Sequence, residues 1–232
     1  MGIARNAGSE GAMGKKAVTI LLVGDCALAR AGIRRVLDDE PEFTVVAETD
    51  TPTEAMRLAR SKPPRVVVLD VNPPCVSALD SARKFVRQCP SAALIVLTPT
   101  VDDLLPGRLL QFGVAGYLTK HCSAQELIDA IREVIEGNRY INAELARRLA
   151  MDRLPGNRRR SPFAALSHRE LQVMLLVAQG KNAREISSWL SLSPKTVNTY
   201  RQRLLGKLGV RSEVELTHLA VRHGVIDIAR CG

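Results

Sequence analysis

Asp70 ends the apolar run RVVVLD, a pattern typical of a strand buried on both faces. A carboxylate there lies where open α/β sheets keep their chemistry, although a lone Asp before a proline also fits a simple turn. Gly24 and Asp25 follow the first expected strand, Thr98 ends the fourth and Lys120 follows the fifth. Together they suit a divalent cation and a phosphoryl group: carboxylates hold the cation, one of them is the nucleophile, and hydroxyl and ammonium contact phosphoryl oxygens.

A second functional site is expected in the segment SPKTVNTYRQRLLGKLGV. Its apolar residues recur every three or four positions, at Val197, Tyr200, Leu204 and Leu208, which predicts a helix with one buried stripe. The rest of the helix interleaves groups that bond base edges with cations that neutralise phosphates, as a major-groove helix requires, whereas a merely solvated basic face is the alternative. The expected DNA-binding residues are Lys195, Thr196, Asn198, Thr199, Arg201, Gln202, Arg203 and Lys207.

The first site needs a sheet whose strands all end at one edge. Apolar runs alternate with segments of helical spacing from Val18 onward, giving five β/α units in about 120 residues. The predicted strands are 18–23, 43–48, 65–70, 93–98 and 116–120, and the predicted helices between and after them include 77–88, about 104–112 and 124–137. This order predicts a doubly wound, five-stranded parallel sheet of flavodoxin-like type.

The second site needs a small helical domain. Ser167 and Glu170 form a capping box that opens one helix, a second is expected over 183–190, and Ser193-Pro194 opens a third that reaches about Leu208. A fourth helix follows Ser212, so we expect an all-α four-helix domain. The expected division is a disordered tail at 1–16, the α/β domain at 17–138, a linker with a short helix at 139–162, and the helical domain at 163–228.

Positive charge gathers in the last third of the chain. Residues 158–232 hold 13 Lys and Arg against 5 Asp and Glu, whereas residues 1–157 hold 20 against 19, so nearly all of the net charge of +9 is C-terminal. This asymmetry predicts a nearly neutral domain joined to a basic one that meets a polyanion, either nucleic acid or an anionic membrane surface.

Cysteine usage and hydropathy narrow the class of protein. The five Cys are scattered, with no C-x-x-C pair and no clustered His, which argues against a disulfide framework or a zinc site. No apolar stretch approaches a membrane span, and the opening MGIARNAGSEGAMGKK lacks the core of a signal peptide, so we expect a cytoplasmic protein without a membrane partner. Translation from Met13 instead of Met1 is an open alternative.

On the motifs RVVVLDVNPP and GYLTK, the first domain resembles the receiver domain of bacterial two-component response regulators. The resemblance implies that Asp70 is the phosphoacceptor and that Mg²⁺ is held by Asp25, Asp70 and the backbone carbonyl of Asn72. It implies that Thr98 is the switch hydroxyl, Tyr117 the coupled aromatic and Lys120 the phosphoryl contact. A sensor histidine kinase is then the expected phosphodonor.

This domain also departs from the receiver pattern. Gly24 stands where a second acid is usual, Cys75 where Gly is common, Pro99 after the switch Thr, and His121 where Pro often follows the Lys. One anion fewer predicts weak Mg²⁺ binding and slow phosphotransfer. On this argument a Gly24→Asp change should strengthen both.

The C-terminal segment LSHRELQVMLLVAQGKNAREISSWLSLSPKTVNTYRQRLLGKLGV is similar to the LuxR-type helix-turn-helix domain. A receiver followed by this domain defines the NarL/FixJ class of response regulators. RLLQFGVAGYLTK, LSPKTVNTYR and ELTHLAVRHG are most similar to the GacA/UvrY type, which implies a kinase of BarA/GacS type. The expected function is phosphorylation-controlled transcription regulation, with a homodimer on double-stranded DNA rather than an enzyme.

Three other functions compete with this one. An Asp-nucleophile phosphatase normally carries a second Asp two residues on, where this chain has Asn72. A membrane-surface protein needs an amphipathic helix with a free apolar face, and here the apolar stripe of the basic helix is used internally. The serious alternative is a transcription factor of the same architecture that no longer depends on phosphorylation, for which Gly24 and Pro99 are the reasons.

Overall fold

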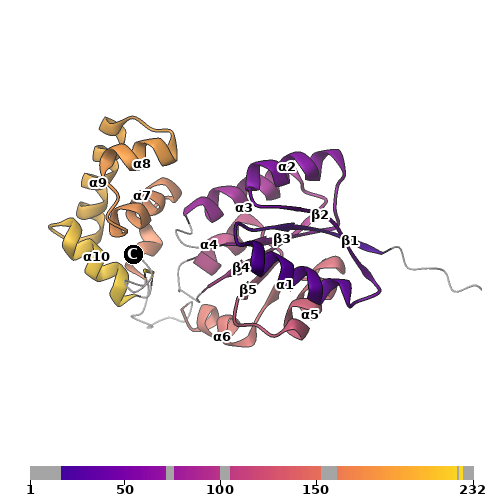
Figure 1. Ribbon diagram of the computed structural model, residues 1–232. Helices are drawn as coiled ribbons and strands as arrows, with labels where there is room; N and C mark the ends of the chain where they lie inside the picture. Colours follow the sequence, from indigo (N-terminus) through magenta and orange to yellow (C-terminus); the bar gives the residue numbers. More distant parts are fainter. Residues whose placement is uncertain (1–16, 72–75, 100–104, 153–160, 224, 227–232) are drawn as a thin grey trace, which may run out of the picture.

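The N-terminal part of the protein is a parallel sheet covered by helices on both faces (Figure 1). The computed structural model describes residues 17–71, 76–99, 105–152, 161–223 and 225–226. The strand order is β2-β1-β3-β4-β5-β6, and each neighbouring pair is parallel. The strands are β1 (Val18–Val23), β2 (Phe43–Thr49), β3 (Val66–Asp70), β4 (Ala93–Thr98), β5 (Gly116–Thr119) and β6 (Tyr140–Ile141).

The sheet has six strands in the described part of the chain, so the predicted count of five is wrong. β6 pairs with Gly116–Tyr117 of β5, and the Tyr140 N–H donates to the Ala115 carbonyl at 2.9 Å. Two residues are too few to show strand periodicity, which is why the pattern missed them. The predicted parallel α/β architecture itself is confirmed, and β6 falls in the range predicted as a linker.

Alternate side chains of the strands face opposite helix layers. Ile20, Leu22 and Val68 pack in one cluster with apolar side chains of α1 and α5, whereas Leu21 and Val67 pack in the other with those of α2, α3 and α4. The helices are α1 (Ala27–Asp38), α2 (Pro52–Ser61), α3 (Val76–Gln88), α4 (Leu105–Phe112), α5 (Ala124–Ile135) and α6 (Ala143–Asp152). Both faces being covered explains why the strands are apolar throughout.

The C-terminal part is helical, and side-chain caps begin its helices. It comprises η1 (Pro162–Ala165), α7 (His168–Ala178), α8 (Ala183–Leu190), α9 (Pro194–Leu208) and α10 (Glu213–Arg222). The capping box predicted at Ser167 and Glu170 is present, and Asn182 and Glu185 form another at α8. Ser193 caps α9 as predicted, accepting from the Thr196 N–H at 3.1 Å. Local sequence therefore defines where each helix starts.

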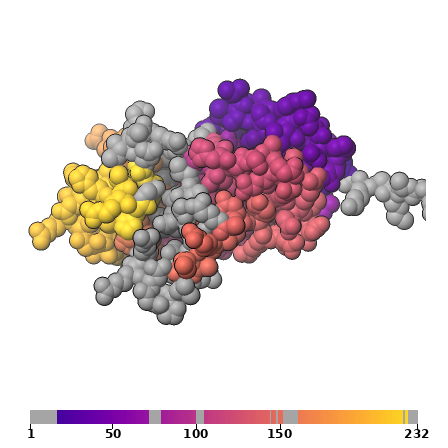
Figure 2. All heavy atoms as spheres, turned by 90° about the horizontal axis from the view of Figure 1, so that it is seen from below, coloured from indigo at the N-terminus to yellow at the C-terminus, as the bar shows by residue number. Residues whose placement is uncertain are grey.

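The two parts meet through α3 and α4 on one side and η1 and α7 on the other. The Arg108 guanidinium donates to the carbonyls of Ala164, at 3.0 Å, and Leu166. The His168 Nε2 lies 2.7 Å from Asp80 Oδ1, and its ring meets Phe112 edge to face with centroids 5.4 Å apart. The yellow C-terminal helices lie at the end of the molecule away from the indigo N-terminal segment (Figure 2).

Apolar packing also crosses this boundary. One cluster of buried side chains includes Leu109 of α4 and Leu145 of α6 together with Phe163, Leu166 and Leu171 of the helical part. Phe163 is fully buried, and its ring lies 5.7 Å from that of His223. The contact between the two parts is therefore apolar as well as charged. Across the described segments, no helix combines the length and the apolar character needed to cross a bilayer.

Candidate functional site

Asp70 lies at the carboxyl end of the central strand β3, between β1 and β4. It is 5% exposed, and the Lys120 ammonium lies 2.5 Å from its Oδ1. Lys120 is fixed at the end of β5 because its N–H donates to the Thr98 carbonyl at 2.8 Å. Among the described residues nothing donates a hydrogen bond to Asp70 Oδ2, although this atom is buried. A buried carboxylate oxygen with this surrounding suits a cation.

A cavity of about 290 Å³ leads to this carboxylate between α1 and α5. Its floor is Asp70, Leu97 and Lys120, and Ile33 of α1 and Leu127 of α5 lie in its walls. Both carboxylate oxygens of Asp70 are buried, so a phosphoryl group reaches them from this cavity only when neighbouring side chains move apart.

Thr98 and Tyr117 form a buried pair on adjacent strands. Their hydroxyl oxygens are 2.6 Å apart, and each residue is 1% exposed. β4 and β5 pair in parallel register here, with Thr98 opposite Thr119. The hydroxyl predicted to act as a switch thus lies beside the aromatic residue predicted to respond to it.

Gly24 contacts Asp70 directly, which the sequence did not reveal. A Cβ atom at Gly24 would lie 2.8 Å from the Asp70 Cβ and 3.2 Å from its Oδ2. Real Cβ atoms do not approach so closely, so any side chain at this position displaces backbone or Asp70 itself. A Gly24→Asp change therefore requires the backbone or the Asp70 side chain to shift, and the expectation that it strengthens the cation site stays a prediction.

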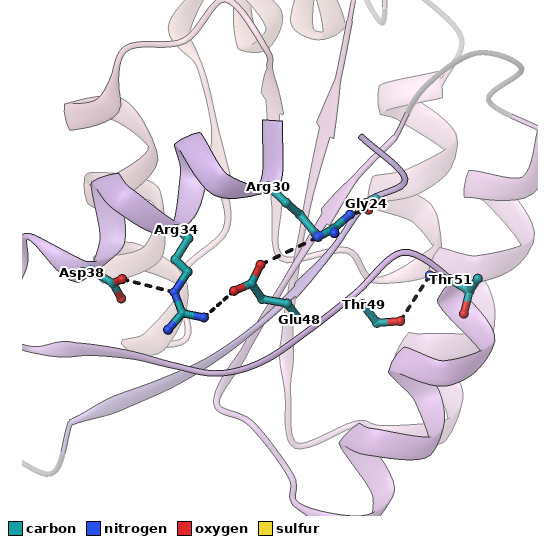
Figure 3. A network of polar contacts seen from close by, with 7 residues as sticks. All are labelled: Gly24, Arg30, Arg34, Asp38, Glu48, Thr49 and Thr51. Carbon is teal, nitrogen blue, oxygen red and sulfur yellow. Dashed lines mark hydrogen bonds and ion pairs between the residues drawn. The ribbon is translucent and has the colours of Figure 1, made fainter. Parts of the chain in front are cut away.

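Asp25, the first residue after Gly24, is exposed. The preceding residue, Gly24, is fixed by two hydrogen bonds. The Gly24 N–H donates to the Thr49 carbonyl at 3.0 Å, and the Gly24 carbonyl accepts from the Arg30 guanidinium. Figure 3 shows Arg30 joined through Glu48 to Arg34. The turn that carries Asp25 is thus attached to β2 and to α1.

A divalent cation is compatible with the donors at this edge. Asp25 and Asp70 offer hard carboxylate oxygens, and the buried Asp70 Oδ2 accepts no hydrogen bond from the described residues. No group of three or more His, Cys, Asp or Glu side chains within the described residues could hold a metal, so backbone oxygen and water must complete the shell. Asn72, the predicted carbonyl ligand, lies outside the described residues, as does Cys75.

The outer face of α9 is open. Val197 and Leu204 of the predicted stripe are buried, and Tyr200 and Leu208 are half-buried against the same core. The predicted base-facing side chains of this helix are exposed although the two parts of the chain are in contact. They are Asn198, Thr199 and Gln202, with Lys195 and Arg203 exposed beside them.

Two cations predicted to contact phosphates are engaged within the protein. The Arg201 guanidinium pairs with Glu213 of α10, and the Lys207 ammonium lies 2.8 Å from Glu170 Oε2. Glu170 is 4% exposed and also accepts from the Ser167 N–H at 2.8 Å. Burial would raise the pKa of Glu170, but the hydrogen bonds from Lys207 and Ser167 outweigh it and lower that pKa. Arg201 and Lys207 thus stabilise the helical domain.

The hydroxyls of α9 also have local partners. Thr196 Oγ1 lies 2.8 Å from Ser193 Oγ, and Thr199 Oγ1 donates to the Lys195 carbonyl at 3.0 Å. The Thr199 hydroxyl can donate to a phosphate only after leaving the Lys195 carbonyl, whereas its oxygen can still accept a hydrogen bond from a base amino group. Among the predicted DNA-facing groups, Asn198, Gln202, Lys195 and Arg203 have the most accessible hydrogen-bonding ends.

Comparison with known proteins accounts for both sites. Residues 20–132 match the family described as response regulator receiver domain, and residues 164–220 match bacterial regulatory proteins of the luxR family. The chain is 43% identical over 210 residues to response regulator UvrY of Escherichia coli (strain K12), covering 90% of this chain and 96% of that protein. The chain belongs to this family of response regulators.

A second relative and a solved structure agree with this assignment. The regulator is 42% identical over 212 residues to response regulator GacA of Pseudomonas aeruginosa PAO1, covering 91% of this chain and 99% of that protein. Its fold is similar to that of the RcsB response regulator of Salmonella typhimurium, with a TM-score of 0.72 and 22% identity over 89% of this chain and 98% of that one.

Membership of this family establishes the general function. The regulator is a DNA-binding transcription regulator of a two-component system and not an enzyme. The resemblance stated from the motifs, including its GacA/UvrY type, is confirmed. Receiver domains bind Mg²⁺ and take their signal from sensor kinases, and luxR-type domains bind DNA.

Several contacts around these sites could not be predicted from the sequence. Arg30 and Glu48 belong to different elements, and neither stands in a pattern that predicts their pairing. Glu170 was recognised only as a helix cap, and its second role toward Lys207 depends on how α7 packs on α9. The contact of Asp80 with His168 joins residues 88 positions apart, beyond any local signal.

Proposed function

We propose that Asp70 accepts a phosphoryl group from a sensor kinase of BarA/GacS type and that this modification controls DNA binding. The observation that carries the proposal is a buried carboxylate that borders a cavity and whose Oδ1 is paired with the Lys120 ammonium, 2.5 Å away. In the transfer, an Asp70 oxygen attacks phosphorus while the nitrogen–phosphorus bond of the phosphohistidine breaks and the imidazole keeps the electron pair. Lys120 and Thr98 then contact the new phosphoryl oxygens.

Asp25, Asp70 and the Asn72 backbone carbonyl would hold Mg²⁺ at this edge. The bound cation neutralises charge on the phosphoryl group during transfer. We expect weak binding, because Gly24 supplies no carboxylate. A high Mg²⁺ requirement for phosphotransfer follows from that missing anion.

Phosphorylation adds between about one and two negative charges beside the pair of Thr98 and Tyr117. Thr98 reaches the phosphoryl group only by leaving its 2.6 Å contact with the Tyr117 hydroxyl. The Tyr117 hydroxyl would then lose this contact. Helix α4, which follows β4, carries the Arg108 contact to the DNA-binding domain. This is a short route from the carboxylate to the domain boundary.

For the DNA-binding domain we propose that Asn198, Thr199 and Gln202 contact bases and that Lys195, Thr196 and Arg203 contact phosphates. Arg201 and Lys207 were predicted to contact phosphates as well. We assign them a smaller share, since each already pairs with a carboxylate. The proposed target is double-stranded DNA read in its major groove.

We further propose that the regulator binds DNA as a homodimer and acts in the cytoplasm. A single small helix-turn-helix module offers limited contact, and paired half-sites are the usual remedy. We propose the division 17–138 for the receiver, 139–162 for the linker and 163–228 for the DNA-binding domain. The predicted disordered tail at 1–16 lies outside the described residues.

Intact-mass measurement after incubation with a small phosphodonor and Mg²⁺ tests the phosphoacceptor. Wild type should gain one phosphoryl mass, and Asp70→Asn should gain none. Asp50→Asn is the matched control, because Asp50 is an exposed carboxylate at the end of β2 on the same sheet edge. Labelling of Asp70→Asn to the wild-type level would show that another residue is the acceptor.

A phosphorylation-independent regulator of the same architecture is the second candidate. Its support is Gly24, which stands where a second acid is usual, and Pro99, which follows the switch Thr. In that case wild type gains no phosphoryl mass, and Asp70→Asn binds operator DNA as tightly as wild type treated with phosphodonor. A clear difference in DNA affinity between the treated wild type and the variant would exclude this candidate.

A further inference from the structure

Arg30, in the first turn of α1, is attached to the last residue before Asp25. Its guanidinium donates to the Gly24 carbonyl at 2.5 Å (Figure 3). The Gly24 N–H donates to the Thr49 carbonyl at 3.0 Å. Both backbone polar groups of Gly24 are thus occupied. Because Gly24 also touches Asp70, the position of the Asp25 backbone relative to Asp70 is fixed through Gly24.

Arg30 is itself held by a chain of charges. Its Nε lies 3.7 Å from Glu48 Oε2, and Glu48 also pairs with Arg34, whose Nε lies 3.2 Å from Asp38 Oδ2. The side chains of Arg30 and Glu48 are only 20% and 25% exposed. Their mutual position is therefore better defined than that of an ordinary surface pair.

Two effects of Arg30 on a cation bound nearby oppose each other. Its positive charge repels the cation, but Glu48 largely cancels that charge, so the repulsion changes cation affinity by no more than about twofold. Its hydrogen bond to the Gly24 carbonyl comes from a charged donor, a stronger class of bond, and its loss frees the turn that carries Asp25. The second effect is the larger.

We infer that Arg30 is a positioning residue for the divalent cation: it holds the Gly24 carbonyl so that the Asp25 carboxylate starts beside Asp70. The inference rests on the proposed Mg²⁺ site. With a single acid after β1, the site depends on the placement of Asp25 more than a site with two acids does. Arg30 acts through Asp25 and needs no contact with the cation.

Calorimetric titration of the full chain with Mg²⁺ tests this role. Arg30→Met, which removes both charge and donors, should weaken Mg²⁺ binding by about three- to tenfold. Arg30→Lys, which keeps a donor and the charge, should stay within about twofold of wild type. Arg34→Met is the matched control, because it removes the neighbouring arginine of the same network without touching Gly24, and it should also stay within about twofold.

A second measurement avoids substitution altogether. In wild type, saturating Mg²⁺ should shift the Arg30 Nε–H resonance more than that of Arg34, since only Arg30 bonds the turn before Asp25. Arg30→Met binding Mg²⁺ as tightly as wild type, or more tightly, overturns the inference while leaving the Mg²⁺ site standing. Wild type that takes up no Mg²⁺ overturns the site and the inference together.

Discussion

Asp70 of the receiver and Gln202 of α9 are the side chains on which the two proposed activities most depend, and their surroundings are opposite. Asp70 is 5% exposed, is paired with Lys120, and borders one cavity. Gln202 is exposed on a helix face that the receiver leaves open. The receiver encloses its carboxylate, whereas the DNA-binding domain exposes the side chain of Gln202 on its surface.

The difference follows from what each site must bind. A phosphoryl group and a small cation need charges held at short range with little competing water, which only a partly closed edge provides. The major groove of DNA admits one helix of the domain, so the side chains that contact DNA must project outward from that helix. Around α9, the charges that serve the fold, Arg201 and Lys207, are paired with Glu213 and Glu170, and those that remain open are free to serve DNA.

The largest effect is expected from breaking the ion pair between Glu170 of α7 and Lys207 of α9. Glu170→Ala removes the cap of the Ser167 N–H and the partner of Lys207, and should lower the free energy of unfolding of the DNA-binding domain by on the order of 2–3 kcal/mol. Urea unfolding followed by circular dichroism measures it. Glu185→Ala is the matched control, because Glu185 closes the same kind of box on α8 and pairs with Lys181, but its own side chain is 42% exposed against 5% for Glu170. It should cost about 1 kcal/mol or less.

The next effect concerns the open face. Gln202→Ala should leave the free energy of unfolding nearly unchanged and reduce discrimination at one base position by about 1–3 kcal/mol, since an exposed side chain serves the ligand more than the fold. Competition binding with single-base operator variants measures it. Equal losses on operator and random DNA would contradict a base-reading role for Gln202.

A smaller effect separates the two lysines of α9. Lys195→Ala should flatten the dependence of log affinity on log salt by about one unit, because Lys195 is exposed and is proposed to contact phosphates. Lys207→Ala should flatten it by clearly less, because Lys207 is paired with Glu170. Fluorescence anisotropy over a range of salt concentrations gives both slopes. Identical slopes for the two variants would count against the distinction between open and paired cations.

The smallest effect is expected from the contact between Asp80 and His168, where the receiver meets the DNA-binding domain. The hydrogen bond from His168 lowers the pKa of Asp80 from its ordinary 3.8 to about 2. A lowered pKa stabilises the docked state above pH 3.8 and stops doing so as pH falls through about 2. Because Asp80 is 31% exposed, solvent screening reduces this contribution to about 1 kcal/mol.

Comparing wild type with Asp80→Asn measures this contribution. The two should differ in unfolding free energy by about 1 kcal/mol near neutral pH and converge toward about pH 2. Asp129→Asn, an exposed carboxylate of α5 that lies 3.6 Å from Arg132, is the control and should show little of this dependence. A difference for Asp80→Asn that persists unchanged into acid would show that its carboxylate charge is not what joins the domains.

The sequence predicted what depends on local pattern and on sheet topology. Asp70, Thr98 and Lys120 were found because parallel strands end at one edge, and the caps at Ser167 and Ser193 because caps are local. The sequence did not predict the contacts that depend on packing between distant segments. The approach of Gly24 to Asp70 and the pairing of Lys207 with Glu170 are examples, and each changed the interpretation of a residue that the pattern had identified correctly.

Leu109 of the receiver packs in one apolar cluster with Phe163 and Leu171 of the DNA-binding domain. Each domain therefore binds the other as an intramolecular ligand. Tethering raises the effective concentration of such a partner to about the millimolar range, so even a weak contact stays occupied most of the time. A ligand that binds only the folded state stabilises it by mass action. The DNA-binding domain therefore gains stability from the docked receiver. A cut between the two domains would remove that gain by dilution alone, with every side chain intact.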